Sequence, residues 1–326
     1  MIDRDIVKAQ LKNTFTELTL NGFGEKYSGK VRDSYIVGDK RIIFTSDRLS
    51  AFDRIISSIP FKGQVLNGMA SYWFAKTEHI IPNHLLAEPH PNVLISKQVN
   101  MLPVEVIVRG YLTGSAWRDY SAGNEVSGIR LPEGMKRSQR FETPLLTPST
   151  KAEMGLHDEA ISCDEVVSRG LVDEALWEEV KRKALELFKF GSDDAAKRNL
   201  ILVDTKYEFG TITNSDGSKT LILADEVHTQ DSSRYWVLDS YKERYNNNLE
   251  PQMLDKEFVR GHLIERGFMG DGDLPLLSDE FRVDTAMKYI EAYERLTGKT
   301  FIPATELSGI QEKIEAFFAV HKSEQK

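Results

Sequence analysis

Two β-rich runs lie on either side of Asn214-Ser215-Asp216-Gly217-Ser218. The first is Leu200-Ile201-Leu202-Val203-Asp204-Thr205-Lys206-Tyr207-Glu208-Phe209-Gly210, and the second is Leu221-Ile222-Leu223-Ala224-Asp225-Glu226. An Asp-Gly pair between two such runs indicates a β-hairpin. With Asp216 and Gly217 as a two-residue type I′ loop, Glu208 is expected directly opposite Asp225. Directly opposed residues share a face, with Cβ atoms roughly 4.5–5.5 Å apart. The sequence therefore predicts an antiparallel strand pair here.

The two faces of this predicted hairpin differ in polarity. Side chains alternate along a strand, so Asp204, Lys206 and Glu208 share one face with Asp225, and the other face is largely apolar. A polar face turned to solvent is the simplest reading of such a pattern. Like charges directly opposed across two strands destabilise the pair, however, which favours a cation between Glu208 and Asp225. Because Mg²⁺ commonly binds one or two carboxylates plus substrate phosphates, the pattern predicts a metal–phosphate site.

Composition narrows the class of protein. The 326 residues are 40% hydrophobic and 28% charged, as in ordinary globular proteins, and are enough for two or three structural units. A net charge of −8 argues against a nucleic-acid-binding protein. The single Cys163 excludes an intrachain disulfide framework and a cysteine-cluster zinc site. No apolar run approaches the roughly 20 residues of a membrane span, and Met1–Asp5 has no signal-peptide core. We therefore expect a soluble cytoplasmic protein with no membrane partner.

A second hairpin is predicted near the N-terminus. Residues 28–37 and 40–45 are β-rich and flank Gly38-Asp39, a suitable two-residue turn. At its entry, Gly29 has no Cβ, so the backbone N–H groups and Lys30 can approach a phosphate closely. An ordinary strand-opening turn explains the same residues.

Two further segments carry polar donors beside predicted strands. The Val/Ile-rich part of residues 101–115 indicates a buried strand that ends near Arg109, and its apolar wall suits an adenine. Donor-rich turns are expected at residues 113–115 and 231–236, the second containing Arg234. A planar guanidinium with neighbouring hydroxyls suits a phosphate or a carboxylate. Residues 147–158 have the composition of a long active-site loop.

Helical spacing of apolar residues accounts for much of the remaining chain. It predicts helices over residues 3–13, 64–77, 173–190, 252–265, 284–297 and 303–320, with the last two beginning at Asp284 and Pro303. Together with the hairpins, this pattern indicates a mixed α+β chain.

The motifs taken together resemble the SAICAR synthetase (phosphoribosylaminoimidazole-succinocarboxamide synthase) family. Two stretches resemble the family signatures: Leu102-Pro103-Val104-Glu105-Val106-Ile107-Val108-Arg109 continuing to Thr113-Gly114-Ser115, and Leu202 to Gly210. Shorter motifs follow the expected order: Gly29 to Asp33, Ser50-Ala51-Phe52-Asp53, His157-Asp158 and Asp231-Ser232-Ser233-Arg234. One departure is His228-Thr229-Gln230, where the family commonly has Thr-Pro, and this leaves the local turn open.

The resemblance implies an α+β, ATP-grasp-like architecture of two lobes with antiparallel sheets and C-terminal helices. Residues 1–101 would form a β-rich nucleotide-binding lobe, and residues 102–240 a central α/β lobe with the substrate and metal site. Residues 241–326 would form a helical part packed on the central lobe. We expect a monomer or a small homo-oligomer.

The resemblance also implies a reaction. An ATP-dependent ligase would condense carboxyaminoimidazole ribotide (CAIR) with L-aspartate to give SAICAR, ADP and phosphate in de novo purine biosynthesis. A carboxylate is a poor acyl donor, so it would first take the γ-phosphoryl group of ATP as an acyl phosphate. The aspartate amine would then attack the acyl carbon. Such phosphoryl transfer needs positioning and charge neutralisation more than covalent help from the protein.

Site residues follow from the same resemblance. The ATP-binding residues would be Gly29, Lys30, Val31, Arg32, Met101, Val104, Glu208 and Asp225, with Mg²⁺ held by Glu208 and Asp225. The substrate-binding residues would be Arg109, Ser115, Asp204, Lys206, Arg234, Arg260, Lys151 and Asp158. Lys206 and Asp204 are the expected catalytic residues. From the position of Lys206 between Asp204 and Glu208 on the hairpin face, we infer that it would stabilise charge on the reacting carboxylate. The loop with Lys151, His157 and Asp158 is a candidate aspartate site.

Two alternatives use the same residues differently. A small-molecule kinase would turn over ATP with a hydroxyl acceptor and would not depend on aspartate. A non-catalytic nucleotide-binding protein would bind nucleotide without regard to Mg²⁺ and would show no turnover. The series Lys30, Lys206, Glu208 and Asp225 disfavours the latter, because opposed carboxylates are costly to keep without a catalytic role.

Overall fold

The chain folds as two units. The computed structural model describes residues 2–52, 54–151, 159–254 and 257–322. Unit 1 comprises Met1–Tyr72, His84–Gln98 and Lys256–Lys326, and unit 2 comprises Trp73–Asn83 and Val99–Asp255. Among the described residues, no helix combines the length and the apolar content needed to cross a bilayer.

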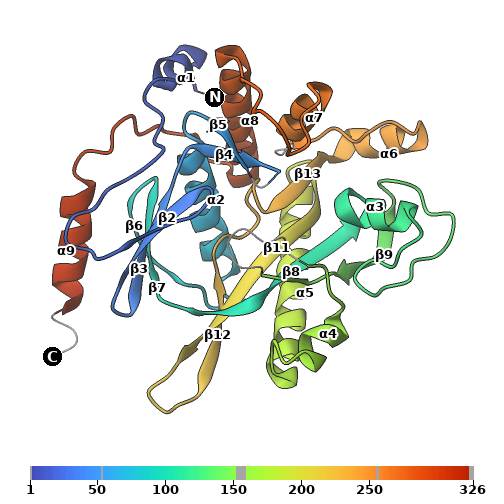
Figure 1. Cartoon of the computed structure of the whole chain (residues 1–326), viewed down its shortest axis with the longest axis horizontal. Helices are drawn as coiled ribbons and strands as arrows, with labels where there is room; N and C mark the ends of the chain where they lie inside the picture. The colour runs from blue at the N-terminus through green and yellow to red at the C-terminus, as the bar shows by residue number, and fades with distance from the viewer. Residues whose placement is uncertain (1, 53, 152–158, 255–256, 323–326) are drawn as a thin grey trace. The chain divides into compact units, whose positions relative to one another are not determined.

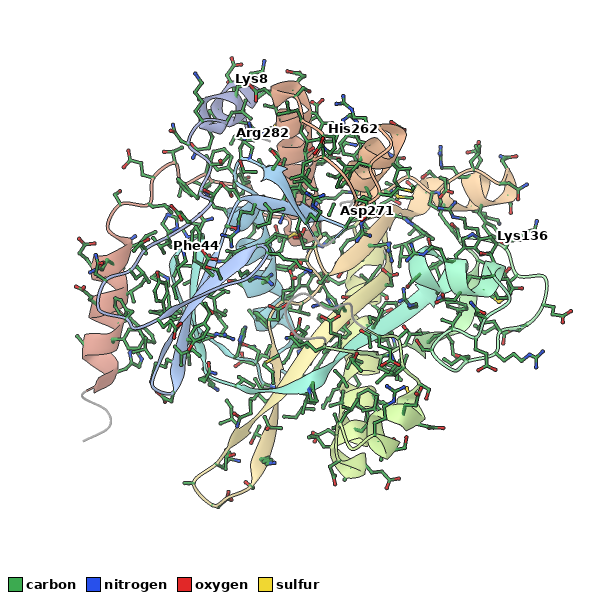
Figure 2. The ribbon with its side chains drawn as sticks, viewed as in Figure 1. Lys8, Phe44, Lys136, His262, Asp271 and Arg282 are labelled. Carbon is green, nitrogen blue, oxygen red and sulfur yellow. The ribbon has the colours of Figure 1, made fainter. Side chains whose placement is uncertain are left out.

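Unit 1 is built on an antiparallel sheet with strand order β1–β2–β3–β7–β6 (Figure 1). These strands are β1 (Lys26–Ser28), β2 (Arg32–Val37), β3 (Lys40–Thr45), β7 (Val93–Lys97) and β6 (Leu85–His90). A separate pair joins β4 (Arg48–Ala51) to β5 (Arg54–Ser58). The helices of this unit are α1 (Arg4–Gln10), α7 (Glu257–Glu265), α8 (Asp279–Thr297) and α9 (Ile310–Lys322), and α2 (Lys62–Thr77) begins here. Phe44 of β3, labelled in Figure 2, is buried in a core that includes Ile310 and Ile314 of α9.

The C-terminal helices belong to unit 1, which differs from the predicted packing of residues 241–326 on the central lobe. Arg282 of α8, labelled in Figure 2, donates hydrogen bonds to the carbonyl oxygens of Ser58 and Leu11. Gln64 of α2 likewise exchanges hydrogen bonds with the backbone of Ala304. These contacts join the tail to N-terminal residues, and helical spacing in the tail could not reveal its packing partner.

Unit 2 is organised around the long strand β11 (Leu200–Thr213), which lies between β8 (Asn100–Tyr111) and β12 (Lys219–Ala224) (Figure 1). Strand β13 (Ser233–Val237) also pairs with β11, and β9 (Arg140–Leu146) and β10 (Ser149–Thr150) pair with β8. The helices are α3 (Gly114–Ser121), α4 (Cys163–Ser168), α5 (Glu174–Ala196) and α6 (Leu238–Asn246). A Cβ added at Gly110 would be 3.2 Å from the Phe188 ring, so glycine lets α5 pack closely on β8.

The central hairpin forms, but its register is one residue from the predicted one. Glu208 pairs with Ala224 and not with Asp225. The prediction of a two-residue loop was wrong: Asn214 N–H donates to the Ser218 carbonyl, which leaves a three-residue loop. Gly217 has φ 83° and closes a turn on Asn214, as in hairpins that combine a type I turn with a left-handed glycine. An Asp-Gly pair is compatible with both loops, so sequence alone does not fix the register.

Several other element boundaries also differ from prediction. The Thr113 segment does not form a free turn; Thr113 is the N-cap residue of α3. Arg234 lies within β13 and not in a turn. Helix α8 begins at Asp279, five residues before Asp284, because the Ser278 side chain caps it by accepting from Phe281 N–H. Helix α9 begins at Ile310 rather than Pro303. The Gly38-Asp39 turn is confirmed by the pairing of Val37 with Lys40.

A buried imidazole lies in the core of unit 2. His228 is fully buried, and its Nε2 is 2.6 Å from the Tyr207 hydroxyl. Trp73 meets the ring edge-on, with centroids 4.8 Å apart. Gly191 of α5 makes room for it, because a Cβ there would be 2.4 Å from the ring. Burial lowers the pKa of His228 to about 3.

We expect the stability of the protein to fall as the pH is lowered from 7 to 5, and His228 to account for about 2 kcal/mol of that loss. The unfolded chain binds a proton on this imidazole near pH 6.5, whereas the folded chain does so only near pH 3. The contribution of His228 to the free energy of unfolding is therefore complete above pH 6.5 and decreases as the pH falls below that value. Urea unfolding at both pH values should show a flatter pH dependence for His228→Gln. The exposed His79→Gln is the control, and an equal flattening in both variants would contradict the assignment.

Candidate active site

Asp204 is the centre of a buried cluster with two arginines. In the register of β11, Asp204 pairs with Arg109 of β8 on one side and with Arg234 of β13 on the other. Its Oδ2 accepts hydrogen bonds from Arg234 Nη1 at 2.5 Å and from Arg109 Nη1 at 3.4 Å. Because Asp204 is only 4% exposed, two guanidinium groups around one carboxylate leave a net positive charge in a largely dry setting.

Hydroxyl groups complete this cluster. Arg109 Nε donates to Thr147 Oγ1 at 2.8 Å, and Arg109 Nη2 donates to Ser115 Oγ at 3.0 Å. Burial lowers the pKa of Arg109, Asp204 opposes that shift, and Arg234 adds to it. Gly114 has φ 60°, and a Cβ there would be 2.8 Å from Arg234 Nη2, so only glycine fits. Fixed guanidinium groups with hydroxyls form a surface suited to a phosphate or carboxylate.

The residues His228-Thr229-Gln230, where the sequence departs from the Thr-Pro common in the family, do not disturb this cluster. Thr229 Oγ1 donates to a carboxylate oxygen of Glu226 and accepts from the N–H groups of Asp231 and Ser232 at 3.3 and 3.4 Å. The threonine side chain thus closes the turn by local hydrogen bonds. The chain then enters β13 with Arg234 next to Asp204.

Lys206 is the centre of a second, acidic cluster on the same face of β11. Its ammonium donates to Glu105 Oε1 at 2.9 Å and to Glu208 Oε1, and it lies 3.9 Å from Asp225 Oδ2. Burial by itself lowers the pKa of Lys206, but Glu208, Asp225 and Glu105 together raise it well above its ordinary value. Lys206 is therefore a protonated cation held among three carboxylates.

Asp225 reaches this cluster by a route that alternation does not predict. Ala224, the last residue of β12, is the partner of Glu208, so a continued strand would turn Asp225 to the other face. The strand ends there, and Asp225 has φ 59°. Asp225 and Glu208 consequently approach the same ammonium. Carboxylates such as Glu208 and Asp225 are the ligands that a hard divalent cation such as Mg²⁺ takes, and one or two of them are enough when phosphates supply further oxygens.

Two residues of this face are missing from the predicted site. Glu105 pairs directly with Glu208 across β8 and β11, so the like-charge pair exists with a different partner from the predicted one. Thr147 holds Arg109. The spacing of Glu105 four residues before Arg109 places both on one strand face and could have identified Glu105. Thr147 is the first residue of the predicted active-site loop, but its contact with Arg109 was not predicted.

Lys151 is the last described residue of the predicted active-site loop. Its ammonium donates to Glu208 Oε2. Part of the predicted loop is a strand: Ser149 and Thr150 form β10 and pair with Glu105 and Val104 of β8. His157 and Asp158 lie outside the described residues. Glu208 thus has an ammonium group at each of its oxygens.

The remaining predicted residues are distributed over both units. In unit 2, Met101 pairs with Gly210 of β11, and Val104 is buried beside β10. In unit 1, residues 29–32 form the end of the β1–β2 hairpin, where Gly29 N–H donates to the Arg32 carbonyl at 2.7 Å. Arg260 lies on α7 of unit 1, whereas the Asp204 cluster belongs to unit 2.

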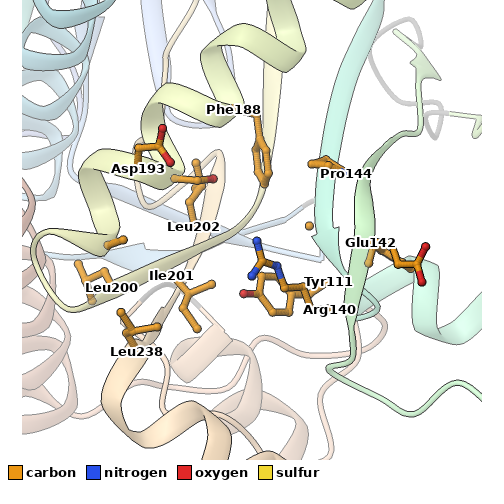
Figure 3. A pocket seen from close by; sticks show the side chains of 14 residues that line it. Tyr111, Arg140, Glu142, Pro144, Phe188, Asp193, Leu200, Ile201, Leu202 and Leu238 are labelled. Atoms are coloured by element: carbon orange, nitrogen blue, oxygen red, sulfur yellow. The ribbon is translucent and has the colours of Figure 1, made fainter.

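A cavity of about 220 Å³ lies elsewhere in unit 2 (Figure 3). It is lined by apolar side chains such as Phe188 of α5 and Leu202 of β11, together with Tyr111 and Arg140. Of the described residues that line it, none belongs to the Asp204 or Lys206 cluster. The candidate active site is therefore the polar face of β11 and not this cavity.

Comparison with known proteins identifies the family. The family model for SAICAR synthetase matches residues 25–274, a range that contains both clusters. The chain belongs to the SAICAR synthetase family. The sequence-based recognition and the expected α+β fold are thereby confirmed.

Individual SAICAR synthetases are similar over nearly the whole chain. A putative phosphoribosylaminoimidazole-succinocarboxamide synthase 2 of Agrobacterium fabrum is 46% identical over 302 residues, covering 90% of this chain and 94% of the relative. The synthase of Bacteroides thetaiotaomicron is 45% identical over 307 residues, covering 93% and 96%. A Saccharomyces cerevisiae SAICAR synthase solved with SAICAR has a TM-score of 0.76 and 33% identity, covering 89% of this chain and all of that one. A SAICAR synthetase solved with ADP has a TM-score of 0.65 and 26% identity, covering 86% and all of that chain.

Proposed function

We propose that this SAICAR synthetase condenses CAIR with L-aspartate, at the expense of ATP, to give SAICAR, ADP and phosphate. One observation carries the proposal: alternate residues of β11 place an arginine-rich cluster at Asp204 and a carboxylate cluster at Glu208 on either side of Lys206. The names of the relatives, and the solved complexes of family members with SAICAR and with ADP, support the same reaction.

The chemistry requires two transfers. A carboxylate oxygen of CAIR bonds to the γ-phosphorus of ATP, and the bond to ADP breaks. The aspartate amine then attacks the acyl carbon, loses a proton, and displaces phosphate. In the first step, fixed positive charge stabilises the oxygens of the transferring phosphoryl group and of the leaving ADP. In the second step, it stabilises the negative charge that develops on the carbonyl oxygen when the amine adds to the acyl carbon.

Residues of unit 2 would hold the ribotide. We assign Arg109, Ser115, Asp204 and Arg234 to ribotide binding, since two guanidinium groups and a hydroxyl suit an anionic substrate. Lys206 would contact the carboxylate that reacts, because it is the cation that follows Asp204 on the same strand face. Arg260 of unit 1 is assigned to the ribotide by the family resemblance.

The family resemblance assigns residues of each unit to ATP. In unit 2, Glu208 and Asp225 would hold Mg²⁺, which when bound neutralises charge on the ATP phosphates. Met101 and Val104 would contact adenine. In unit 1, Gly29, Lys30, Val31 and Arg32 would bind the phosphates through backbone N–H groups and the Lys30 ammonium. Lys151 and Asp158 are assigned to the aspartate site; the ammonium of Lys151 contacts Glu208. A cytoplasmic location and a monomer or small homo-oligomer remain our predictions.

The test is release of ADP from ATP in the presence of CAIR and Mg²⁺, with and without L-aspartate. A ligase forms one SAICAR per ADP only when aspartate is present. A small-molecule kinase, which the names of the relatives do not favour, would release ADP at the same rate without aspartate and would form no SAICAR.

A further inference from the structure

The Gly29–Arg32 turn of unit 1 has its carbonyl groups held from one side. Lys30 and Val31 form the tip of the β1–β2 hairpin, because Gly29 N–H donates to the Arg32 carbonyl and Ser28 pairs with Asp33. The carbonyl oxygens of Gly29 and Lys30 both accept from Arg48 of β4, at 3.1 Å in each case. One guanidinium therefore fixes two successive peptide planes.

Every N–H of the Arg48 side chain has an acceptor. Besides the two turn carbonyls, Nη1 donates to the Thr16 carbonyl at 2.9 Å, and the Nη atoms bond both oxygens of Asp33 at 2.7 and 3.3 Å. The Asp33 side chain is fully buried and also pairs with Lys26 of β1 at 3.1 Å. Only a planar fork with five donors can satisfy this set of acceptors.

The orientation of the turn amides follows from peptide geometry. In a planar trans peptide, the C=O and the following N–H point in opposite directions. Because Arg48 attracts the carbonyls of Gly29 and Lys30, the N–H groups of Lys30 and Val31 are directed away from Arg48. The Val31 carbonyl is held in turn by Ser46, whose Oγ and N–H donate to it at 2.7 and 2.9 Å. Successive N–H groups fixed in this way form an anion-binding concavity.

We propose that Arg48 is a positioning residue for nucleotide binding: it holds the Gly29–Arg32 turn in the conformation that presents its amides to the ATP phosphates. The proposal rests on the assignment of this turn to ATP under the proposed function. Arg48 lowers the cost of binding by ordering the turn beforehand, and its side chain need not touch the nucleotide. The Arg48 side chain is 14% exposed.

The test compares Arg48→Lys with Lys30→Ala and with the control Arg54→Lys. Arg54 lies on β5, paired with β4, and also donates to backbone carbonyls, those of Gly270 and Gly272. Calorimetric titration with ADP and Mg²⁺, and steady-state kinetics for each substrate, give the readouts. We expect Arg48→Lys to raise the Kd for ADP and the KM for ATP about tenfold, with the KM values for CAIR and aspartate within about twofold of wild type. Arg54→Lys should leave both nucleotide constants unchanged.

The outcomes separate the inference from the function on which it rests. A weaker nucleotide affinity in Lys30→Ala but not in Arg48→Lys would overturn the positioning role alone. Normal affinity in both variants would overturn the role and also the assignment of the turn to ATP. An equal rise of KM for all three substrates in Arg48→Lys would show general damage and would also overturn it. Asp33→Asn, which keeps the shape and one acceptor oxygen, provides a second variant and should show a smaller rise confined to nucleotide.

Discussion

Replacement of Glu208 by Gln is expected to lower kcat by about two to three orders of magnitude while the protein stays folded. Glu208 is 6% exposed. Together with Asp225, which approaches the same ammonium, it is one of the two carboxylates that we assign to Mg²⁺. A neutral amide binds a hard cation less tightly than a carboxylate does, so the ATP phosphates would lose their alignment. Loss of one fixed electrostatic contact in an active site typically costs a factor of about 10²–10³ in rate.

The measurement is ADP release at saturating CAIR, aspartate and ATP, repeated over a range of Mg²⁺ concentrations. The mutant should show a higher Mg²⁺ requirement as well as a lower maximal rate. Glu125→Gln removes an exposed glutamate of the same unit and serves as the control. A Glu208→Gln enzyme with near-normal rate and Mg²⁺ dependence would refute the metal assignment and leave the family membership intact.

Replacement of Lys206 by Ala should reduce kcat/KM for CAIR by about 100-fold or more. The ammonium is the cation between the ribotide residues and the carboxylate cluster, and its removal takes away the positive charge assigned to the reacting carboxylate. The change also leaves Glu105 and Glu208 directly opposed across two strands without their shared counter-ion. A loss of stability of about 1 kcal/mol is expected from that repulsion.

Kinetics at low CAIR concentration and thermal denaturation separate these two effects. Lys206→Met retains much of the apolar stem, so it should recover packing but not catalysis. Lys219→Ala on β12 is the control, since that residue is exposed. An unchanged rate at low CAIR in Lys206→Ala would exclude a role for the ammonium in either binding or chemistry.

The polar face of β11 was predictable from sequence, whereas its partners were not. Period-two alternation correctly places Asp204, Lys206 and Glu208 together, with Val203 and Tyr207 buried on the other face. Pairing depends on loop length, and Asp-Gly is compatible with loops of two and three residues. The predicted opposition of Glu208 and Asp225 is therefore wrong by one position, and only the positive φ of Asp225 returns its carboxylate to the cluster.

Long-range pairing explains the other differences. The polar run Asp231–Arg234 has turn composition, yet Arg234 enters a strand because β11 provides hydrogen-bonding partners for it. The spacing of Glu105 and Arg109 places both on one strand face, but it does not reveal the pairing of Glu105 with Glu208 that brings Glu105 into the acidic cluster. The family resemblance supplied most of the named residues, and the structure supplied the contacts that connect them.

Lys206 gives this fold an internal counter-ion. Acidic side chains gathered to receive a metal ion normally repel one another until that ion arrives, which penalises folding of the empty protein. Here a covalently attached cation occupies the middle of the group from the start. The charge of the acidic group is therefore compensated within the polypeptide itself, so folding does not depend on a ligand bound there.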